Sequence, residues 1–158
     1  MRRLIPFLVA IVILAGCSSI DCSINNLVCL KYKLGDEASE IPGTLSISII
    51  RSNGSDSTIL NSLSGKSEWT LPVSYTQATD VMVFSLTDNQ SILHLDTVSI
   101  SKTNIPHFES VECSPTYFHQ LTDVSWTRHA LDSVIITKST VNYDTTGGHI
   151  KVYFKSDI

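Results

Sequence analysis

The sequence predicts an all-β fold, in the form of an antiparallel β-sandwich, with a small β-barrel as the alternative. Three observations support this expectation. Apolar and polar residues alternate with a period of two in several short segments, which is typical of strands with one buried face. Turn-forming residues separate these segments at intervals of roughly ten residues. No long segment has the periodicity of a helix.

The clearest strand is expected at residues 44–51, TLSISIIR, where aliphatic residues alternate with polar ones. The dipeptide Asn53-Gly54 follows and predicts a two-residue type I′ hairpin turn, because both central positions of that turn need a positive φ. Counting outward from this turn gives the expected cross-strand pairs, which are Ser52 with Ser55, Arg51 with Asp56, Ile49 with Thr58, and Ile47 with Leu60.

Further strands are expected at residues 28–34, 81–87, 92–101, 133–137 and 149–155. Asp88-Asn89-Gln90 predicts the turn before the third of these. The apolar phase changes within residues 92–101, and a β-bulge near Asp96-Thr97 would explain the change. Residues 106–129 are the least regular and are expected to mix short strands with long loops. These segments together predict a single β-rich domain at residues 26–158, an immunoglobulin-like or related sandwich.

The segment at residues 1–16 predicts a secretory signal peptide. It has two arginines at its start, an apolar run too short to span a bilayer, and small residues before position 17. The tetrad LAGC that ends in Cys17 resembles the lipobox of bacterial lipoproteins. In that family the cysteine takes diacylglycerol, the signal is removed just before it, and the new amino group is acylated, for example with palmitate. The resemblance implies that Cys17 is lipidated and that residues 17–25 form a tether.

The residues after Cys17 bear on the location of the protein. Ser18 stands where an inner-membrane retention signal would place an aspartate, so the resemblance favours the outer membrane. No acidic run follows Cys17, which argues against export to the cell surface. We therefore expect a lipid-anchored, periplasm-facing protein, with the cell surface as the alternative location.

Composition and motifs argue against several classes of function. Without Arg2 and Arg3 the chain has 9 basic and 15 acidic residues and no basic cluster, so nucleic-acid binding is not expected. No serine lies in a Gly-x-Ser-x-Gly elbow, and we expect no enzymatic activity. His107, Cys113 and His119 are evenly spaced but match no zinc signature, so neither a metal nor another cofactor is expected.

Three cysteines remain after lipidation, namely Cys22, Cys29 and Cys113. Export to an oxidising compartment favours a disulfide between two of them. Cys22 has the parity of the inward residues of the first strand, whereas Cys29 shares the face of two lysines. We therefore expect a Cys22–Cys113 bridge with Cys29 free; Cys29–Cys113 and Cys22–Cys29 stay open as alternatives.

One candidate ligand surface surrounds Trp126. It lies in VSWTRH beside Arg128 and His129, a polar context that allows partial exposure and the binding of a glycan or a peptide. The competing interpretation, which we favour, is that Trp126 caps the core.

A recurring triplet, Asp-[Ser/Thr] followed by an aliphatic residue or threonine, occurs four times, whereas independent placement predicts about one match. It resembles the O-glycosylation acceptor that Bacteroidetes use on exported proteins. The resemblance implies glycans on the four central hydroxyl residues, which are Ser57, Thr97, Ser133 and Thr145.

The mature chain also resembles a family of uncharacterised Bacteroidetes lipoproteins defined by a domain of unknown function. The segments that carry this resemblance are SSIDCSIN, LPVSYTQATDVMVFSL, DTVSISKTNIPHFESVECSPTYFH, HALDSVIIT and HIKVYFK. The resemblance implies a lipoprotein with a β-rich fold in the cell envelope. The function that we expect is a non-enzymatic outer-membrane lipoprotein whose β-domain binds an envelope protein or assembly partner. The alternative is a surface module that binds a glycan or a peptide.

Overall fold

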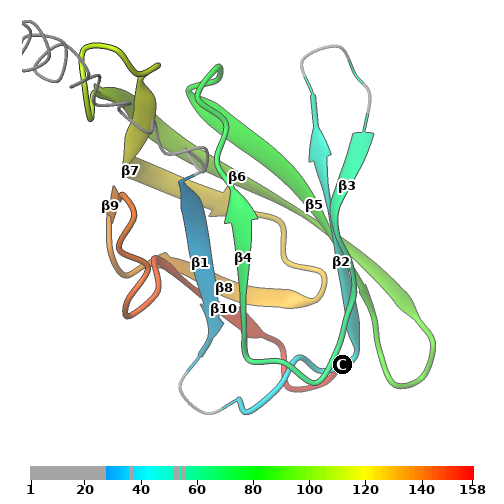
Figure 1. The fold of residues 1–158 in the computed structure, drawn as a ribbon. Coiled ribbons are helices and arrows are strands. Elements are labelled where there is room, and N and C mark those ends of the chain that lie inside the picture. Colours follow the sequence, from blue (N-terminus) through cyan, green and yellow to red (C-terminus); the bar gives the residue numbers. More distant parts are fainter. Residues whose placement is uncertain (1–27, 36–37, 52–53, 55) are drawn as a thin grey trace, which may run out of the picture.

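Ten strands in two sheets form the part of the chain that the computed structural model describes, which is residues 28–35, 38–51, 54 and 56–158 (Figure 1). The four-stranded sheet has the order β4-β1-β10-β8, formed by Glu68–Pro72, Cys29–Leu34, Ile150–Phe154 and Leu131–Ile136. The six-stranded sheet has the order β3-β2-β5-β6-β7-β9, formed by Asp56–Leu63, Thr44–Ile50, Thr79–Thr87, Leu93–His107, Thr116–Trp126 and Thr140–Val141. The paired strands are antiparallel except for β1 and β10, which are parallel.

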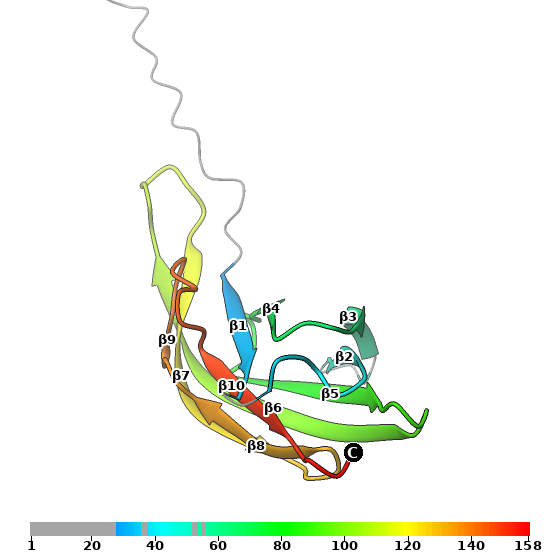
Figure 2. The ribbon, with the colours of Figure 1, turned by 90° about the horizontal axis from the view of Figure 1, so that it is seen from below.

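The inward residues of the two sheets form the core. Tyr32 of β1 is fully buried and stacks on Trp69 of β4, with ring centroids 5.5 Å apart. The same ring meets Phe84 of β5 edge-on at 6.3 Å, and its hydroxyl lies 3.8 Å from the sulfur of Met82. Tyr32 therefore joins the two sheets. They are not closed into a barrel, which confirms the all-β sandwich and excludes the barrel alternative (Figure 2).

The strands predicted from alternation are confirmed, with shifted ends. The predicted segments 28–34, 44–51, 81–87, 133–137 and 149–155 correspond to β1, β2, β5, β8 and β10, and the turn at Asp88-Asn89-Gln90 joins β5 to β6. The bulge predicted at Asp96-Thr97 is wrong, because β5 and β6 pair without a shift from Thr87↔Leu93 to Thr79↔Ser101. The apolar phase changes instead because Leu93 and Leu95 point to solvent while Asp96 takes the inward position.

The predicted hairpin register at β2 and β3 is partly wrong. Ile47 pairs with Leu60 as expected, but Ile49 pairs with Ser57, and Asp56 pairs with Ile50 instead of Arg51. Irregularities near Ile47 shift the register, so the two strands do not continue straight into a two-residue turn. Asn53, Ser52 and Ser55 lie outside the described residues.

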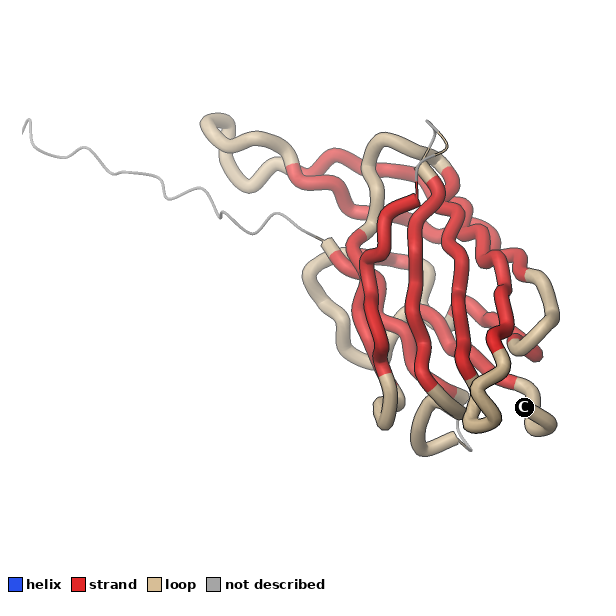
Figure 3. Tube along the Cα trace, turned by 90° about the vertical axis from the view of Figure 1, so that its right-hand side faces the viewer, coloured by secondary structure: helices blue, strands red, loops and turns tan. Residues whose placement is uncertain are grey.

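Residues 106–129, expected to mix short strands with long loops, contain the loop and the second strand of the longest hairpin in the described chain, so the prediction of short strands is wrong for β7. β6 and β7 pair from Val98↔Trp126 to His107↔Thr116, with one shift at Ser101/Lys102. This hairpin projects beyond the other strands (Figures 2 and 3). Its outer part has no opposing sheet to cover a face, so it lacks the apolar alternation from which strands are predicted.

Candidate functional site

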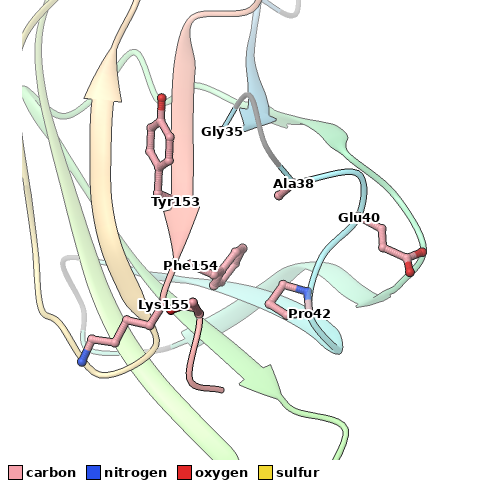
Figure 4. A pocket seen from close by; sticks show the side chains of 8 residues that line it. Gly35, Ala38, Glu40, Pro42, Tyr153, Phe154 and Lys155 are labelled. Atoms are coloured by element: carbon pink, nitrogen blue, oxygen red, sulfur yellow. The ribbon is translucent and has the colours of Figure 1, made fainter.

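A groove of about 410 Å³ lies between β10 and the connection from β1 to β2 (Figure 4). We call it the distal groove. Its lining residues are Gly35, Ala38, Glu40, Pro42, Tyr153, Phe154, Lys155 and Ser156. The walls are mainly apolar, with Phe154 facing Pro42 across the groove (Figure 4). Such a lining suits apolar side chains of a ligand, with the two charged residues at its edge giving orientation.

Backbone geometry fixes the aromatic wall of the distal groove. A Cβ at Gly35 would lie 2.2 Å from ring atoms of Tyr153, so only glycine lets the ring lie against the end of β1. The amide of Gly35 donates a hydrogen bond to the carbonyl of Val152 at 2.9 Å, which holds the two segments together. Phe154 packs partly against the core. One wall of the groove is thus formed by β10, which is held against the end of β1.

The predicted ligand surface at Trp126 borders this groove. Lys155 donates from Nζ to the carbonyl of Arg128 at 2.8 Å and from its backbone amide to the carbonyl of Ala130 at 2.9 Å. The loop with Arg128 and His129 is therefore attached to the end of β10. The groove and this loop together form what we call the distal face.

Trp126 itself has a largely structural environment. Its indole N–H donates to the carbonyl of Asp132 at 3.2 Å, and the ring packs partly against the core. The guanidinium of Arg128 lies over the ring, 5.5 Å from its centroid. Since the guanidinium and the core already cover the indole, the geometry favours a cap on the core, as the sequence interpretation expected.

Asp96 is a buried residue whose role the sequence interpretation missed. Its carboxylate accepts hydrogen bonds from the hydroxyl of Thr127 at 2.7 Å and from the amides of His129, Ala130 and Leu131 at 2.8, 2.7 and 2.9 Å. Burial alone would raise the pKa of this carboxyl, but the hydrogen bonds outweigh it and lower the pKa. Asp96 therefore shapes the loop of the distal face. In the sequence, the change in apolar alternation within β6 was the feature that could have indicated an inward-facing Asp96.

The four predicted O-glycosylation residues lie at separate places and are all half-buried. Ser57 is in β3, Thr97 in β6, Ser133 in β8 and Thr145 in the connection from β9 to β10. Two of the preceding aspartates have local structural roles. Asp96 holds the loop described above, and Asp144 accepts hydrogen bonds from Thr146 N at 2.9 Å and Lys138 Nζ at 2.7 Å. Local turn chemistry thus accounts for the triplet at Asp144, and the bonds to a distant loop account for the aspartate at position 96.

The cysteines fall into two groups. Cys29 is a free, half-buried thiol in β1, and burial raises its pKa, which lowers its reactivity. Cys113 lies in the loop at the end of the β6–β7 hairpin and takes part in a disulfide. Cys17 and Cys22 lie outside the described residues, so the lipidation site and the Cys22–Cys113 pairing stay predictions.

The histidines of the β6–β7 hairpin have separate structural environments. His107 stacks on Phe118 with ring centroids 4.2 Å apart. His119 is buried, and its Nδ1 lies 2.7 Å from Oδ1 of Asn104. Burial, with help from the charge of Lys102, lowers the pKa of His119 to about 4. Within the described residues, no group of three or more His, Cys, Asp and Glu side chains is arranged to hold a metal.

Comparisons with known proteins give two matches. The family of unknown function DUF6452 matches residues 44–154, and the prokaryotic membrane lipoprotein lipid attachment site matches residues 1–18. No curated protein and no solved structure gives a significant match to the chain. In the described part of the chain, no helix is long and apolar enough to cross a membrane.

Proposed function

Because the chain belongs to the DUF6452 family and carries a lipoprotein attachment site, we propose that it is a lipid-anchored envelope protein whose β-sandwich binds a partner. The partner is a protein or an assembly at the outer membrane, bound through the distal groove without enzymatic chemistry. The domain faces the periplasm in this proposal.

The position of the distal groove is the observation that carries this proposal. Strand β1 begins at Cys29, next to the N-terminal segment that holds the lipid attachment site, and ends at Leu34, just before Gly35 of the groove. Six extended residues span about 20 Å. The groove is thus a strand length away from the point where the chain enters the sandwich, at the opposite end of β1 (Figure 1).

The lining of the groove supports a protein as the partner. Tyr153, Phe154, Pro42 and Ala38 present apolar surface, and Glu40 and Lys155 stand at the edge with opposite charges. An apolar centre with a polar rim is the usual composition of a protein interface. The glycan alternative has less support, since the indole of Trp126 is already covered by Arg128 and the core.

Photocrosslinking in intact cells tests the proposal. A photoreactive amino acid at Ala38 is expected to give an adduct of discrete mass, and the same group at Thr70, which is exposed on β4, serves as the matched control. Tyr153→Ser should abolish the adduct without changing the melting temperature much, because Tyr153 is only half-buried. Equal adducts at positions 38 and 70, or an adduct that survives Tyr153→Ser, would contradict the proposal.

Two further measurements address location and modification. Protease treatment of intact cells should leave a periplasm-facing domain uncut, whereas cleavage would support the cell-surface alternative. The intact mass of the native protein tests glycosylation at Ser57, Thr97, Ser133 and Thr145. A mass that exceeds the chain by the lipid alone would remove that hypothesis.

A further inference from the structure

The loop that closes the β6–β7 hairpin exposes apolar side chains at its outermost point. Val111 is fully exposed, and Phe108 is 62% exposed. Ile105 lies in β6, three residues before Phe108, and is 47% exposed. Large exposed apolar side chains that are close together in the chain indicate a surface that contacts another protein or a membrane. We call residues 108–115 the hairpin tip.

Aromatic rings with polar atoms lie directly behind the hairpin tip. Phe118 stacks on His107 and meets Tyr143 edge-on at 5.2 Å, while Tyr75 stacks on Tyr117 at 5.0 Å. Along the hairpin, apolar side chains thus lie at the tip, and tyrosine rings and an imidazole lie behind them, closer to the sandwich. This order matches the depth profile of a bilayer surface, where tyrosine rings sit at the level of the headgroups.

A buried polar network keeps the base of the hairpin rigid. Lys102 Nζ pairs with Asp80 Oδ2 at 2.8 Å and donates to the carbonyl of Gln77 at 3.0 Å. Asn104 donates from Nδ2 to the carbonyl of Tyr75 at 2.9 Å, with His119 on its other side. The connection from β4 to β5 is therefore attached to the hairpin, and the tip is presented in one orientation.

The hairpin tip lies at the end of the sandwich where the anchored segment enters. The amide of Val73 donates to the carbonyl of Val28 at 3.4 Å, so the start of the described chain adjoins the β4–β5 connection that carries Tyr75. Eleven residue steps separate Cys17 from Val28, a reach of at most about 40 Å. The lipid on Cys17 therefore keeps this end of the domain close to the bilayer, and Figure 2 shows the tip projecting at the same end as the start of β1.

We propose that the hairpin tip inserts Phe108 and Val111 into the surface of the bilayer that holds the lipid anchor, and so fixes the orientation of the domain. The lipid provides the attachment, and the tip sets which end faces the membrane. Glu109 and Glu112 are exposed on the same loop, so a zwitterionic bilayer is the surface that fits, and anionic lipids repel the tip. The inference rests on the lipid anchor and is independent of partner binding at the distal groove.

Fluorescence quenching in proteoliposomes tests this orientation. The lipidated full-length chain is reconstituted in phosphatidylcholine and phosphatidylethanolamine vesicles whose acyl chains carry bromine. Phe108→Trp and Ile92→Trp place a reporter beyond either end of β6, about 50 Å apart along the strand. The native chain, which contains Trp69 and Trp126, gives the background emission. Relative to it, we expect the added emission at position 108 to shift to the blue and to be quenched by bromine, and the added emission at position 92 to show neither effect.

A second substitution separates lipid contact from other causes. Val111→Glu in the Phe108→Trp background should remove most of the quenching and leave the melting temperature unchanged, because the Val111 side chain is fully exposed. Equal quenching at both reporters overturns the proposal. So does a blue shift at position 108 without quenching, since the tip would then be covered by the tether or by a second copy of the chain.

Discussion

At the scale of single residues, buried polar groups determine the shape of the loops. Asp96 is the clearest case, since one carboxylate accepts four hydrogen bonds and three of them come from consecutive backbone amides. Buried backbone amides need acceptors, and the loop between β7 and β8 offers no other strand to supply them. Asp96 is thus an internal acceptor that replaces sheet hydrogen bonds.

Replacing Asp96 by alanine should therefore destabilise the domain. Three amides and a hydroxyl lose their acceptor, and the expected loss is about 3 kcal/mol or more in the free energy of unfolding. Urea denaturation measures it. Asp132→Ala, a change at an exposed position of the adjoining strand, should stay within about 0.5 kcal/mol of the native chain. A loss below about 1 kcal/mol for Asp96→Ala would contradict this role.

His119 makes the stability depend on pH. Its pKa falls from the ordinary 6.5 to about 4 in the folded protein because the ring is buried, so the unfolded chain binds the proton first. The free energy of unfolding has its full value above pH 6.5 and falls by up to about 3 kcal/mol as the pH drops toward 4. His149 is buried too, and its lowered pKa acts in the same direction.

NMR titration of the imidazole resonances checks this expectation directly. The His119 resonance should stay constant from pH 7.5 to about 5 while the protein is folded, and His119→Gln should flatten the stability profile between pH 6.5 and 4. An inflection of the His119 resonance near pH 6.5 would show that the ring is accessible to water and would contradict the predicted pH dependence.

At the scale of elements, alternation predicts a strand only where one face is covered. β1, β2, β5 and β10 were found from the sequence because their inward residues face the opposite sheet. β7 was missed because its outer part belongs to the projecting hairpin. The distal groove was missed as well, since Gly35 and Pro42 indicate a turn in the sequence but do not show that Tyr153 packs against it.

Gly43 fixes the junction between β2 and β5. Its φ is 141°, and an added Cβ would lie 2.2 Å from the carbonyl oxygen of Thr87. Gly43→Ala should therefore lower the free energy of unfolding by about 3 kcal/mol, because a steric clash adds to the backbone strain. Gly54→Ala is the matched control, because φ is 76° there but no atom lies within 4 Å of the added Cβ.

The control variant Gly54→Ala should lower the free energy of unfolding by only about 1 kcal/mol, which is the cost of a left-handed backbone without a clash. Thermal unfolding of both variants gives the comparison. If the two variants lose the same stability, strain alone accounts for the result and the close approach of Gly43 to β5 is not as described.

At the scale of the whole molecule, we expect Cys17 to determine attachment to the membrane. The lipid attachment site matches residues 1–18. We expect Cys17→Ser to abolish metabolic labelling with a palmitate analogue and to leave the chain at the mass of its precursor. Cys29→Ser should be labelled like the native chain, because Cys29 lies within β1. Labelling of the Cys17→Ser chain would place the lipid elsewhere.

A Cys22–Cys113 disulfide would connect the anchored end of the chain to the projecting hairpin. Cys29 is free and Cys113 is bonded, so if Cys17 carries the lipid, Cys22 is the remaining candidate partner. A Cys22–Cys113 bridge closes a loop of 91 residue steps, and the chain-entropy relation assigns such a loop about 4 to 5 kcal/mol. It would also leave only five residue steps between the lipid and the hairpin tip, at most about 18 Å.

Cys113→Ser should therefore lower the melting temperature strongly, and a reducing agent should lower that of the native chain but not that of the variant. Cys29→Ser should change neither, because its thiol forms no bridge. Peptide mapping without reduction must then yield Cys22 joined to Cys113. Recovery of Cys22 as a free thiol would contradict the pairing. The hairpin tip would then depend on the longer reach through Val28 to meet the bilayer, and its orientation would be set by Phe108 and Val111 alone.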